Sequence, residues 1–230
     1  MSVAESLRRT RERIGHACGR ARRDPVSVRI VAVTKTHPPE LVAAAIAAGV
    51  DAIGENRVQE AAEKRPLVAG TIPWHLVGPL QRNKAKLALD LFDLVETVDR
   101  HELADRLEML LAPADRILPV FVEVNVGGEA QKSGIAPAAC PSLIEHLLTH
   151  CCHLRFAGLM TVPPYDPDPE RSRPYFAALR GLAAERALRF SLPAFELSMG
   201  MSEDFEVAVE EGATWVRLGR VLFGERRVVA

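Results

Sequence analysis

Lys35 is the residue of this chain whose position gives it the clearest chemical potential. It follows the apolar, β-branched run Val28–Val33, which is typical of a buried strand, and it precedes the helix signal Pro38-Pro39-Glu40. Desolvation at such a strand end favours a neutral amine, the form that condenses with an aldehyde to give a Schiff base. The same position also suits a lysine that simply reaches solvent over an apolar stem. This segment by itself leaves both roles open.

Two glycine-bearing segments near the C-terminus could bind an anion. The segment Ser198–Asp204 follows one predicted strand and opens a predicted helix, with Ser202 as a plausible N-cap. Gly200 lets backbone N–H groups approach an anion closely, and the helix dipole favours negative charge there. Gly219 follows the last predicted strand and could supply a second set of amides. Taken singly, each segment is equally typical of a capped helix or a tight turn.

Eight short apolar runs alternate with amphipathic helical patterns along the chain. The predicted strands are Val28–Val33, Asp51–Gly54, Trp74–Val77, Leu94–Val98, Pro119–Val124, Arg155–Met160, Ala194–Leu197 and Thr214–Leu218. The predicted helices are residues 2–22, ahead of the first strand, and then Leu41–Ala48, Val58–Lys64, Arg82–Leu89, Glu102–Leu111, Cys140–Leu148, Arg171–Glu185 and Glu203–Glu210.

This alternation predicts a parallel sheet with helical crossovers. A doubly wound sheet is possible, but eight units over 230 residues suit an α/β fold of the (β/α)8 TIM-barrel type better, with an extra N-terminal helix. The longest irregular stretch, Thr161–Pro169, is a proline-rich loop that could form a rim or lid. No linker divides the chain, so we predict a single domain over residues 1–230.

Closure of such a barrel would bring these chemical groups together. Barrels frequently bind phosphate with the loops after strands seven and eight, where Gly200 and Gly219 are expected. The first strand lies beside the eighth, and neighbouring strands are about 4.8 Å apart. Lys35 would therefore lie within a small ligand's reach of that phosphate. A ligand with an aldehyde and a phosphate on one small ring fits this spacing, and pyridoxal 5'-phosphate is such a ligand.

Arg217 could contact the ring of that ligand. It shares strand parity with Trp215 and Gly219 on the eighth predicted strand, so its side chain could face the same site. A guanidinium keeps its proton and offers no acceptor. Against a pyridine nitrogen it would keep that nitrogen unprotonated and make the ring a weak electron sink. An ordinary ion pair with a carboxylate such as Glu211 is the alternative.

Other polar residues give weaker signals. Asn56 could donate a hydrogen bond to a ring oxygen or cap the helix that follows it. His75 lies within the third predicted strand, where a hydrogen-bonded core histidine is the commoner outcome. The segment Gln81–Lys84 is typical of the solvated start of a helix. Lys132, in the glycine-rich loop Gly127–Gly134, could reach either a ligand or solvent.

Composition excludes several functional classes. A net charge of -1 gives no electrostatic case for nucleic acid or an anionic membrane. The N-terminus lacks the apolar core of a signal peptide, and no apolar run is long enough to span a bilayer. The four cysteines, Cys18, Cys140, Cys151 and Cys152, have neither Cys-x-x-Cys nor zinc-like spacing. They fit a reducing compartment, so we expect a cytoplasmic protein with no disulfide between Cys151 and Cys152.

Taken in order, these motifs resemble the pyridoxal phosphate homeostasis protein family, and they span nearly the whole chain. The motifs that carry the resemblance are Ala32–Thr36, Gly54–Glu60, Trp74–Lys84, Lys132–Gly134, Gly158–Thr161, Leu197–Ser202, Val216–Arg220 and Phe223-Gly224.

The resemblance implies a barrel like the N-terminal domain of alanine racemases, with pyridoxal 5'-phosphate bound as an aldimine to Lys35. It places the phosphate at Ser198, Gly200 and Gly219, and Arg217 at the pyridine nitrogen. Arg220 stands where many members carry a small hydroxyl residue, which leaves only its backbone N–H for the phosphate. The predicted cofactor-binding residues are Lys35, Asn56, His75, Met160, Ser198, Gly200, Arg217, Gly219 and Arg220, and no catalytic residue or metal site is predicted.

The rival interpretation is a pyridoxal-phosphate-dependent amino-acid racemase. Two-base racemisation needs a second acid or base on the face opposite the lysine. The racemases that the barrel resembles take a tyrosine from a separate β-domain, which we do not find here. The two tyrosines, Tyr165 and Tyr175, lie in or near the proline-rich loop and its helix. A third interpretation is a phosphate-binding barrel enzyme without the cofactor.

We therefore expect a cofactor-binding protein rather than an enzyme, one that serves intracellular vitamin B6 homeostasis. Its expected partners are pyridoxal-phosphate-requiring apoenzymes, with no nucleic acid and no membrane, and its expected state is a monomer. Whether a second cofactor site exists near Lys132 or Arg226-Arg227 stays open at this point.

Overall fold

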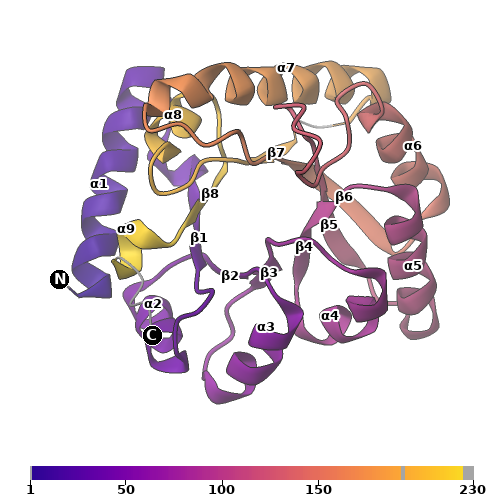
Figure 1. Ribbon diagram of the computed structural model, residues 1–230, viewed down its shortest axis with the longest axis horizontal. Coiled ribbons are helices and arrows are strands. Elements are labelled where there is room, and N and C mark those ends of the chain that lie inside the picture. The colour runs from indigo at the N-terminus through magenta and orange to yellow at the C-terminus, as the bar shows by residue number, and fades with distance from the viewer. Residues whose placement is uncertain (1, 193–194, 225–230) are drawn as a thin grey trace.

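Eight parallel strands form a closed barrel in the order of the chain, from β1 to β8 (Figure 1), in the computed structural model of residues 2–192 and 195–224. This architecture confirms the predicted (β/α)8 barrel. The strands are β1 Arg29–Val33, β2 Ala52–Glu55, β3 Trp74–Leu76, β4 Leu94–Val98, β5 Leu118–Glu123, β6 Leu154–Met160, β7 Glu196–Ser198 and β8 Trp215–Leu218.

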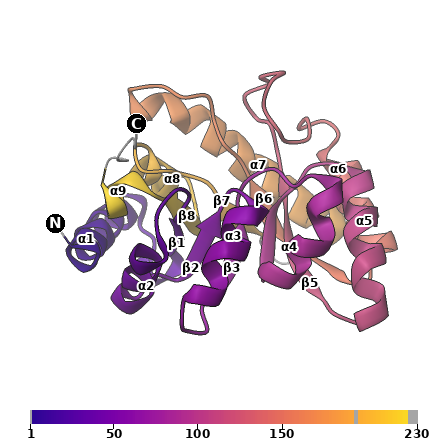
Figure 2. The same cartoon turned by 60° about the horizontal axis from the view of Figure 1, so that its bottom comes forward.

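Helices surround the strands on the outside of the barrel, as the two ribbon views show (Figures 1 and 2). The predicted N-terminal helix is present as α1, which packs against α2, α8 and α9. The α-helices are α1 Val3–Ala21, α2 Pro39–Ala48, α3 Val58–Lys64, α4 Ala85–Leu91, α5 His101–Leu111, α6 Cys140–His150, α7 Arg173–Phe190, α8 Phe205–Glu210 and α9 Arg220–Phe223.

The pairing of β1 with β8 closes the barrel. Val31 lies opposite Arg217, and Ala32 lies opposite Leu218. This register confirms that the first and eighth strands are neighbours, and it sets the start of the Lys35 loop beside the end of β8. The groups expected to bind an aldehyde and a phosphate therefore meet at one edge of the barrel.

The interior of the barrel is apolar in one part and polar in another. One side chain from each of six strands contributes to a small apolar cluster, consisting of Val31, Ala52, Leu94, Phe121, Met160 and Trp215. Polar side chains that are also buried lie beside this cluster, namely His75, Glu96, Ser198 and Arg217. Buried polar groups need hydrogen-bond partners, so this part of the interior must be internally paired.

The segment after β7 differs from the prediction. Helix α8 begins at Phe205 rather than Glu203, and its N-cap residue is Asp204, so the assignment of Ser202 as the N-cap was wrong. The cause is a local turn, in which Asp204 Oδ1 accepts the backbone N–H of Met201 at 2.7 Å and keeps residues 201–204 out of the helix. Strand β7 reaches Ser198, and its predicted start at Ala194 lies outside the described residues.

Two further expectations can be compared with the structure. All four cysteines are free thiols, so Cys151 and Cys152 form no disulfide, as predicted. Within the described part of the chain, no helix combines the length and apolar character needed to cross a bilayer. The predicted helix Arg82–Leu89 is a 3-10 turn, Arg82–Lys84, followed by α4.

Candidate cofactor-binding site

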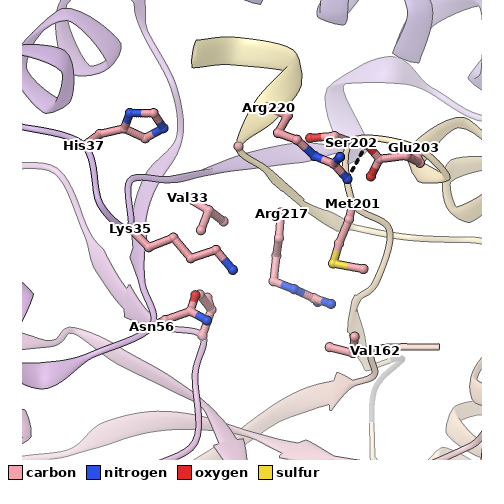
Figure 3. A pocket seen from close by; sticks show the side chains of 12 residues that line it. Val33, Lys35, His37, Asn56, Val162, Met201, Ser202, Glu203, Arg217 and Arg220 are labelled. Carbon is pink, nitrogen blue, oxygen red and sulfur yellow. Dashed lines mark ion pairs between the residues drawn. The ribbon is translucent and has the colours of Figure 1, made fainter. Parts of the chain in front are cut away.

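A cavity of about 240 Å³ opens at the carboxyl-terminal edge of the barrel, where β1, β2 and β8 end (Figure 3). This is the edge at which barrels of this type carry their chemistry. Its lining residues are Val33, Lys35, His37, Asn56, Val77, Val162, Met201, Ser202, Glu203, Arg217, Gly219 and Arg220. The Lys35 side chain extends across the cavity toward the side that carries Arg217 (Figure 3).

A buried ion pair fixes the residue that precedes Lys35. Lys64 Nζ, on α3, lies 2.7 Å from Glu55 Oε1 and donates to the Thr34 carbonyl at 2.8 Å. The Thr34 hydroxyl donates to the same Glu55 oxygen at 2.6 Å. Burial raises the pKa of Glu55, and the hydrogen bonds from Lys64 and Thr34 oppose that rise. The backbone immediately before Lys35 is therefore tied to both β2 and α3.

The residue after Lys35 is fixed from the same helix. Thr36 has a positive φ of 66°, an uncommon conformation for a β-branched residue. Its backbone N–H donates to Glu60 Oε2 at 2.8 Å, and the same carboxylate oxygen lies 3.3 Å from Lys64 Nζ. Lys35 thus lies between two residues whose positions α3 determines. This arrangement could not be predicted from the sequence, because Lys64 is 29 positions from Lys35 and has the spacing of an ordinary helix lysine.

Arg217 is held by a buried hydrogen-bond network across the barrel. One guanidinium nitrogen donates to Ser198 Oγ at 2.7 Å, and the other donates to the Thr161 carbonyl at 2.7 Å. Ser198 donates its hydroxyl to Glu96 Oε2 at 2.5 Å, and that oxygen lies 3.9 Å from Arg217. His75 Nδ1 lies 2.8 Å from the other Glu96 oxygen. Residues on β3, β4 and β7, together with the residue that follows β6, therefore fix the orientation of one guanidinium.

The charges in this network set the protonation of its members. Burial opposes ionisation of Glu96, but the hydrogen bond and charge of His75, together with Arg217 and Ser198, hold the pKa of Glu96 below its usual value. Burial lowers the pKa of Arg217, against the opposing effect of Glu96 and other carboxylates. A guanidinium pKa is so high that Arg217 stays charged at neutral pH. The pair Glu96–Arg217 is thus an ionised pair in the barrel interior.

Glu123, at the end of β5, is a buried carboxyl that the sequence analysis did not single out. Burial raises its pKa to about 7, and the nearby negative charges of Asp99 and Glu96 add to the effect while Arg217 opposes it. Its Oε2 atom has no hydrogen-bond partner among the described residues. A carboxyl in such a setting changes charge close to neutral pH.

Glycines shape the opposite end of the cavity. Gly200 has a φ of 92°, and a Cβ atom there would lie 2.5 Å from the Cβ of Ala208. The backbone of the loop after β7 therefore packs directly on α8 in a conformation that favours glycine. Gly219 lies against β1, since a Cβ there would be 3.4 Å from the Val33 carbonyl oxygen. Both loops bring their backbones close to the cavity.

The side chains at this end are tied to one another. Ser202 Oγ accepts the backbone N–H of Val221 at 3.2 Å and so links the loop after β7 to the helix after β8. Arg220 forms an ion pair with Glu203 at 2.7 Å (Figure 3). The side chain of Arg220 is therefore directed to a carboxylate.

The structure brings five of the nine predicted cofactor-binding residues to the cavity wall: Lys35, Asn56, Arg217, Gly219 and Arg220. Gly200 shapes the loop beside them. The remaining three, His75, Met160 and Ser198, are buried in the barrel and do not line the cavity.

Each of these three has another structural setting. His75 pairs with Glu96 and lies edge-on to Trp215, with ring centroids 4.8 Å apart, so it is a hydrogen-bonded core histidine. Met160 belongs to the apolar cluster inside the barrel. The Ser198 hydroxyl bonds to Glu96 and Arg217, which leaves Ser202 as the serine of this segment that reaches the cavity.

The alternatives left open for other residues can also be decided. Asn56 does not cap α3, because the N-cap residue is Arg57 and no side chain caps that helix. Glu211, the suggested partner of Arg217, pairs instead with Arg173 and Arg180 at 2.9 and 2.7 Å. Lys132 donates to the Pro163 carbonyl at 2.9 Å and does not line the cavity. The Arg226-Arg227 segment lies outside the described residues.

Comparison with known proteins identifies the family. The family model described as "Alanine racemase, N-terminal domain" matches residues 6–227. A protein of Aquifex aeolicus named "Pyridoxal phosphate homeostasis protein" is 42% identical over 228 residues, which cover 99% of this chain and 100% of that protein. The human protein of the same name is 38% identical, with 98% of this chain and 87% of that protein covered. The chain belongs to the pyridoxal phosphate homeostasis protein family.

Solved structures agree with membership of this homeostasis family. PipY of Synechococcus elongatus, solved with pyridoxal phosphate bound, is 35% identical and superposes with a TM-score of 0.85, covering 97% of this chain and all of PipY. An alanine racemase of Clostridium difficile superposes with a TM-score of 0.72 at 15% identity, covering 88% of this chain and 56% of the racemase. At that identity the racemase shares the fold alone.

Proposed function

We propose that this protein binds pyridoxal 5'-phosphate at Lys35 and serves vitamin B6 homeostasis by holding and delivering that cofactor. The observation that carries this proposal is the cavity in which Lys35, Arg217 and the glycine-bearing loop ends lie together. A relative supports the proposal: PipY was solved with pyridoxal phosphate bound, and its alignment covers 97% of this chain and all of PipY.

The residues of the cavity fit this cofactor. Pyridoxal phosphate brings an aldehyde, which condenses with a primary amine with loss of one water, and a phosphate that requires hydrogen-bond donors. Lys35 provides the amine, between two backbone positions that α3 fixes. The glycine-bearing loops supply the backbone at this end: Gly219 lines the cavity, and Gly200 packs on α8 beside the lining residues Met201 and Ser202. Backbone N–H groups of such loops are suited to bind an anion.

Arg217 is suited to contact the ring without donating a mobile proton. Ser198 and Thr161 orient its guanidinium, which still reaches the cavity wall. A charged guanidinium beside a pyridine nitrogen disfavours protonation of that nitrogen and so weakens the ring as an electron sink. This arrangement favours storage of the cofactor over carbanion chemistry.

The wall opposite Lys35 supports a role other than racemisation. It carries Arg217, Met201 and Val162 (Figure 3), none of which exchanges protons readily near neutral pH. Tyr165 is 77% exposed, and neither it nor Tyr175 lines the cavity. Among the described residues, the acid-base side chains besides Lys35 that line the cavity are His37, which lies on the Lys35 side (Figure 3), and Glu203, which is paired with Arg220 at 2.7 Å. Neither is among the groups opposite Lys35, where two-base racemisation needs its second acid or base. Recipient enzymes in need of pyridoxal phosphate are the partners that this role requires.

The absorbance spectrum of the purified protein tests this proposal. Wild-type protein incubated with pyridoxal phosphate should show the band of a lysine-bound cofactor at about 420 nm. Lys35→Ala should lose this band, whereas Lys86→Ala, which removes an exposed lysine from α4, should retain it. A wild-type protein that takes up no cofactor would overturn the proposal. Chiral analysis after incubation with single amino-acid enantiomers tests the non-catalytic role, which appreciable racemisation would refute.

A further inference from the structure

A second cavity, of about 520 Å³, lies at the same edge of the barrel as the first. It is formed by the segments that follow β2, β3 and β4 and by Ser133 of the segment after β5, and it shares Asn56 with the first cavity. Residues 56–59, 79–81 and 84, which line it, belong to two of the motifs that carry the family resemblance. The proposed cofactor site and its supporting contacts use Asn56, Glu55, Glu60 and His75 from these motifs. Arg57, Gln59, Gln81 and Lys84 have no role in them and line the second cavity instead.

Cationic side chains predominate on the wall of this second cavity. Arg57, Lys84 and Arg100 line it, and Asp99 is the one carboxylate among its described lining residues. Asp99 is already neutralised, because it forms an ion pair with Arg100 and accepts the Gly134 backbone N–H at 3.4 Å. The charges of Arg57 and Lys84 therefore remain in excess on this wall.

The carboxylate nearest to Arg57 does not cancel that excess. Glu60 lies 4.0 Å from Arg57 and is 3.3 Å from Lys64, and it also accepts the Thr36 backbone N–H. Burial would raise the pKa of Glu60, but these contacts hold it below its usual value. The Glu60 carboxylate is thus already paired with Lys64 of α3 and with the Lys35 loop. The Arg57 side chain is 77% exposed and lines the second cavity.

Other lining groups make this cavity suitable for a small organic anion. Arg100 donates to the Leu80 carbonyl at 3.1 Å, which fixes both residues in the wall. Gln59, Gln81 and Ser133 add neutral hydrogen-bond donors, and apolar side chains complete the lining. Pockets of this kind bind small molecules through apolar contact plus a few oriented polar groups, and cations select phosphate or carboxylate.

We propose that the second cavity binds the phosphate or carboxylate end of a small organic anion, with Arg57 and Lys84 as its charged contacts. Because the two cavities meet at Asn56, such an anion would lie beside the molecule held at Lys35. Phosphorylated B6 compounds and amino or oxo acids both carry the required group. The neighbourhood of a bound cofactor rests on the proposed function, but anion binding by this cavity does not.

The test blocks the first cavity and titrates the second. Protein loaded with pyridoxal phosphate and reduced with borohydride carries a permanent adduct at Lys35, which mass spectrometry verifies. Inorganic phosphate, pyridoxamine 5'-phosphate and L-alanine are then titrated separately while backbone amide NMR shifts are recorded. Saturable shifts at residues 57–59 and 81–84 are expected with at least one of these ligands. The ligand that binds most tightly distinguishes phosphate from carboxylate recognition.

Matched double variants decide whether the cavity is responsible. Arg57→Gln/Lys84→Gln should weaken the apparent affinity about tenfold or more, because both charged contacts are lost. Arg82→Gln/Lys86→Gln removes the same charge from exposed positions outside the cavity and should change the affinity less than twofold, about the size of a screened surface effect. Equal weakening in both variants, or no saturable shifts with any ligand, would overturn the proposal.

A failure of the proposed function is distinguishable from a failure of this inference. If wild-type protein does not load with pyridoxal phosphate, the same titrations on Lys35→Ala protein still test the second cavity. Loading with one cofactor per chain, followed by no shift at residues 57–59 and 81–84, would refute the second cavity alone.

Discussion

Ser198 and Arg217 lie on the neighbouring strands β7 and β8, and their side chains meet inside the barrel, with Ser198 Oγ 2.7 Å from a guanidinium nitrogen. The same hydroxyl donates to Glu96 at 2.5 Å, so Ser198 links the cation to the carboxylate that balances it. Burying such a pair is favourable only when its remaining hydrogen bonds are satisfied. Ser198 therefore acts on the cavity through Arg217, whereas Ser202 faces the cavity itself.

Alanine substitution of these two serines should lower the free energy of unfolding by different amounts. Ser198→Ala leaves the buried Glu96 oxygen without its hydroxyl donor, so the free energy of unfolding should fall by about 1–3 kcal/mol. Ser202→Ala removes one partly exposed bond to Val221 and should lower it by less than about 1 kcal/mol. Urea unfolding of both variants measures this difference. Equal losses would show that the Ser198 network does not stabilise the barrel.

The stability of the protein should depend on pH through Glu123. Its pKa is raised to about 7 in the folded state, chiefly by burial, against 4.5 as its ordinary value. The folded state therefore binds the proton more tightly, and raising the pH from about 4.5 to 7 should remove up to about 3 kcal/mol of stability through this group. Glu123→Gln removes the titration, so the variant should gain stability over wild type at pH 8 and differ little near pH 4.5.

The control for Glu123 is an exposed glutamate. Glu63→Gln on α3 alters the same functional group outside the barrel, and its stability relative to wild type should be constant within about 0.5 kcal/mol from pH 4.5 to 8. Thermal unfolding midpoints across this range provide the measurement. A Glu123→Gln profile parallel to that of wild type would contradict the assignment of this titration to Glu123.

The part of the site that the sequence predicts is the part that backbone topology determines. Strand order follows from the alternation of apolar runs and helical patterns, and it places Lys35 beside Gly219 and Arg217 without knowledge of any side-chain contact. The resemblance to the homeostasis family along nearly the whole chain then indicates which cofactor this site is expected to bind. Positions at strand ends were therefore predictable from order and parity alone.

The contacts that orient these groups could not be predicted in the same way. Ser198 and Glu96 are 102 positions apart, and their hydrogen bond depends on how far β4 and β7 tilt across the barrel interior. The resemblance places Ser198 at the phosphate, whereas the predicted strand ended at Leu197; in the structure the strand extends through Ser198, and its hydroxyl contacts Glu96 and Arg217. A shift of one residue in the strand end changes which serine is expected to line the cavity.

The two glycines near the anion end should differ in their tolerance of alanine. Gly200→Ala combines a φ of 92° with a Cβ 2.5 Å from that of Ala208, so the loop after β7 must move. We expect a loss of about 2 kcal/mol or more in unfolding free energy, with cofactor affinity reduced at least tenfold, or about 1.4 kcal/mol. Gly219→Ala places its Cβ at an ordinary 3.4 Å contact with Val33 and should cost about 1 kcal/mol or less.

Circular dichroism and titration with pyridoxal phosphate measure both effects of the glycine substitutions. The two variants share the same chemical change, so the Gly219→Ala protein is the control for the effect of an added methyl group on stability; it is not a control for cofactor affinity, because Gly219 lines the cavity. A Gly200→Ala protein as stable as Gly219→Ala would show that the loop after β7 can adjust without loss.

Lys64 should be required for the position of Lys35, although it lies outside the cavity. Its side chain is 9% exposed and contacts Glu55, Glu60 and the Thr34 carbonyl. Lys64→Met leaves the Glu55 carboxylate buried without its cation, and breaking a buried pair in this way costs about 3–5 kcal/mol. The contacts on both sides of Lys35 are then weakened. The absorbance band of the lysine-bound cofactor, at about 420 nm, should therefore need at least a tenfold higher cofactor concentration for half-maximal formation.

A second substitution distinguishes loss of positioning from loss of folding. Lys64→Met/Glu55→Gln removes the unpaired charge as well, so it should recover part of the lost stability, by about 1–2 kcal/mol. The cofactor affinity should stay low in this double variant, because the Thr34 carbonyl still lacks the Lys64 donor. Urea unfolding and absorbance titration on the same samples separate the two quantities. If affinity returned to the wild-type value together with stability, Lys64 would stabilise the barrel without positioning Lys35.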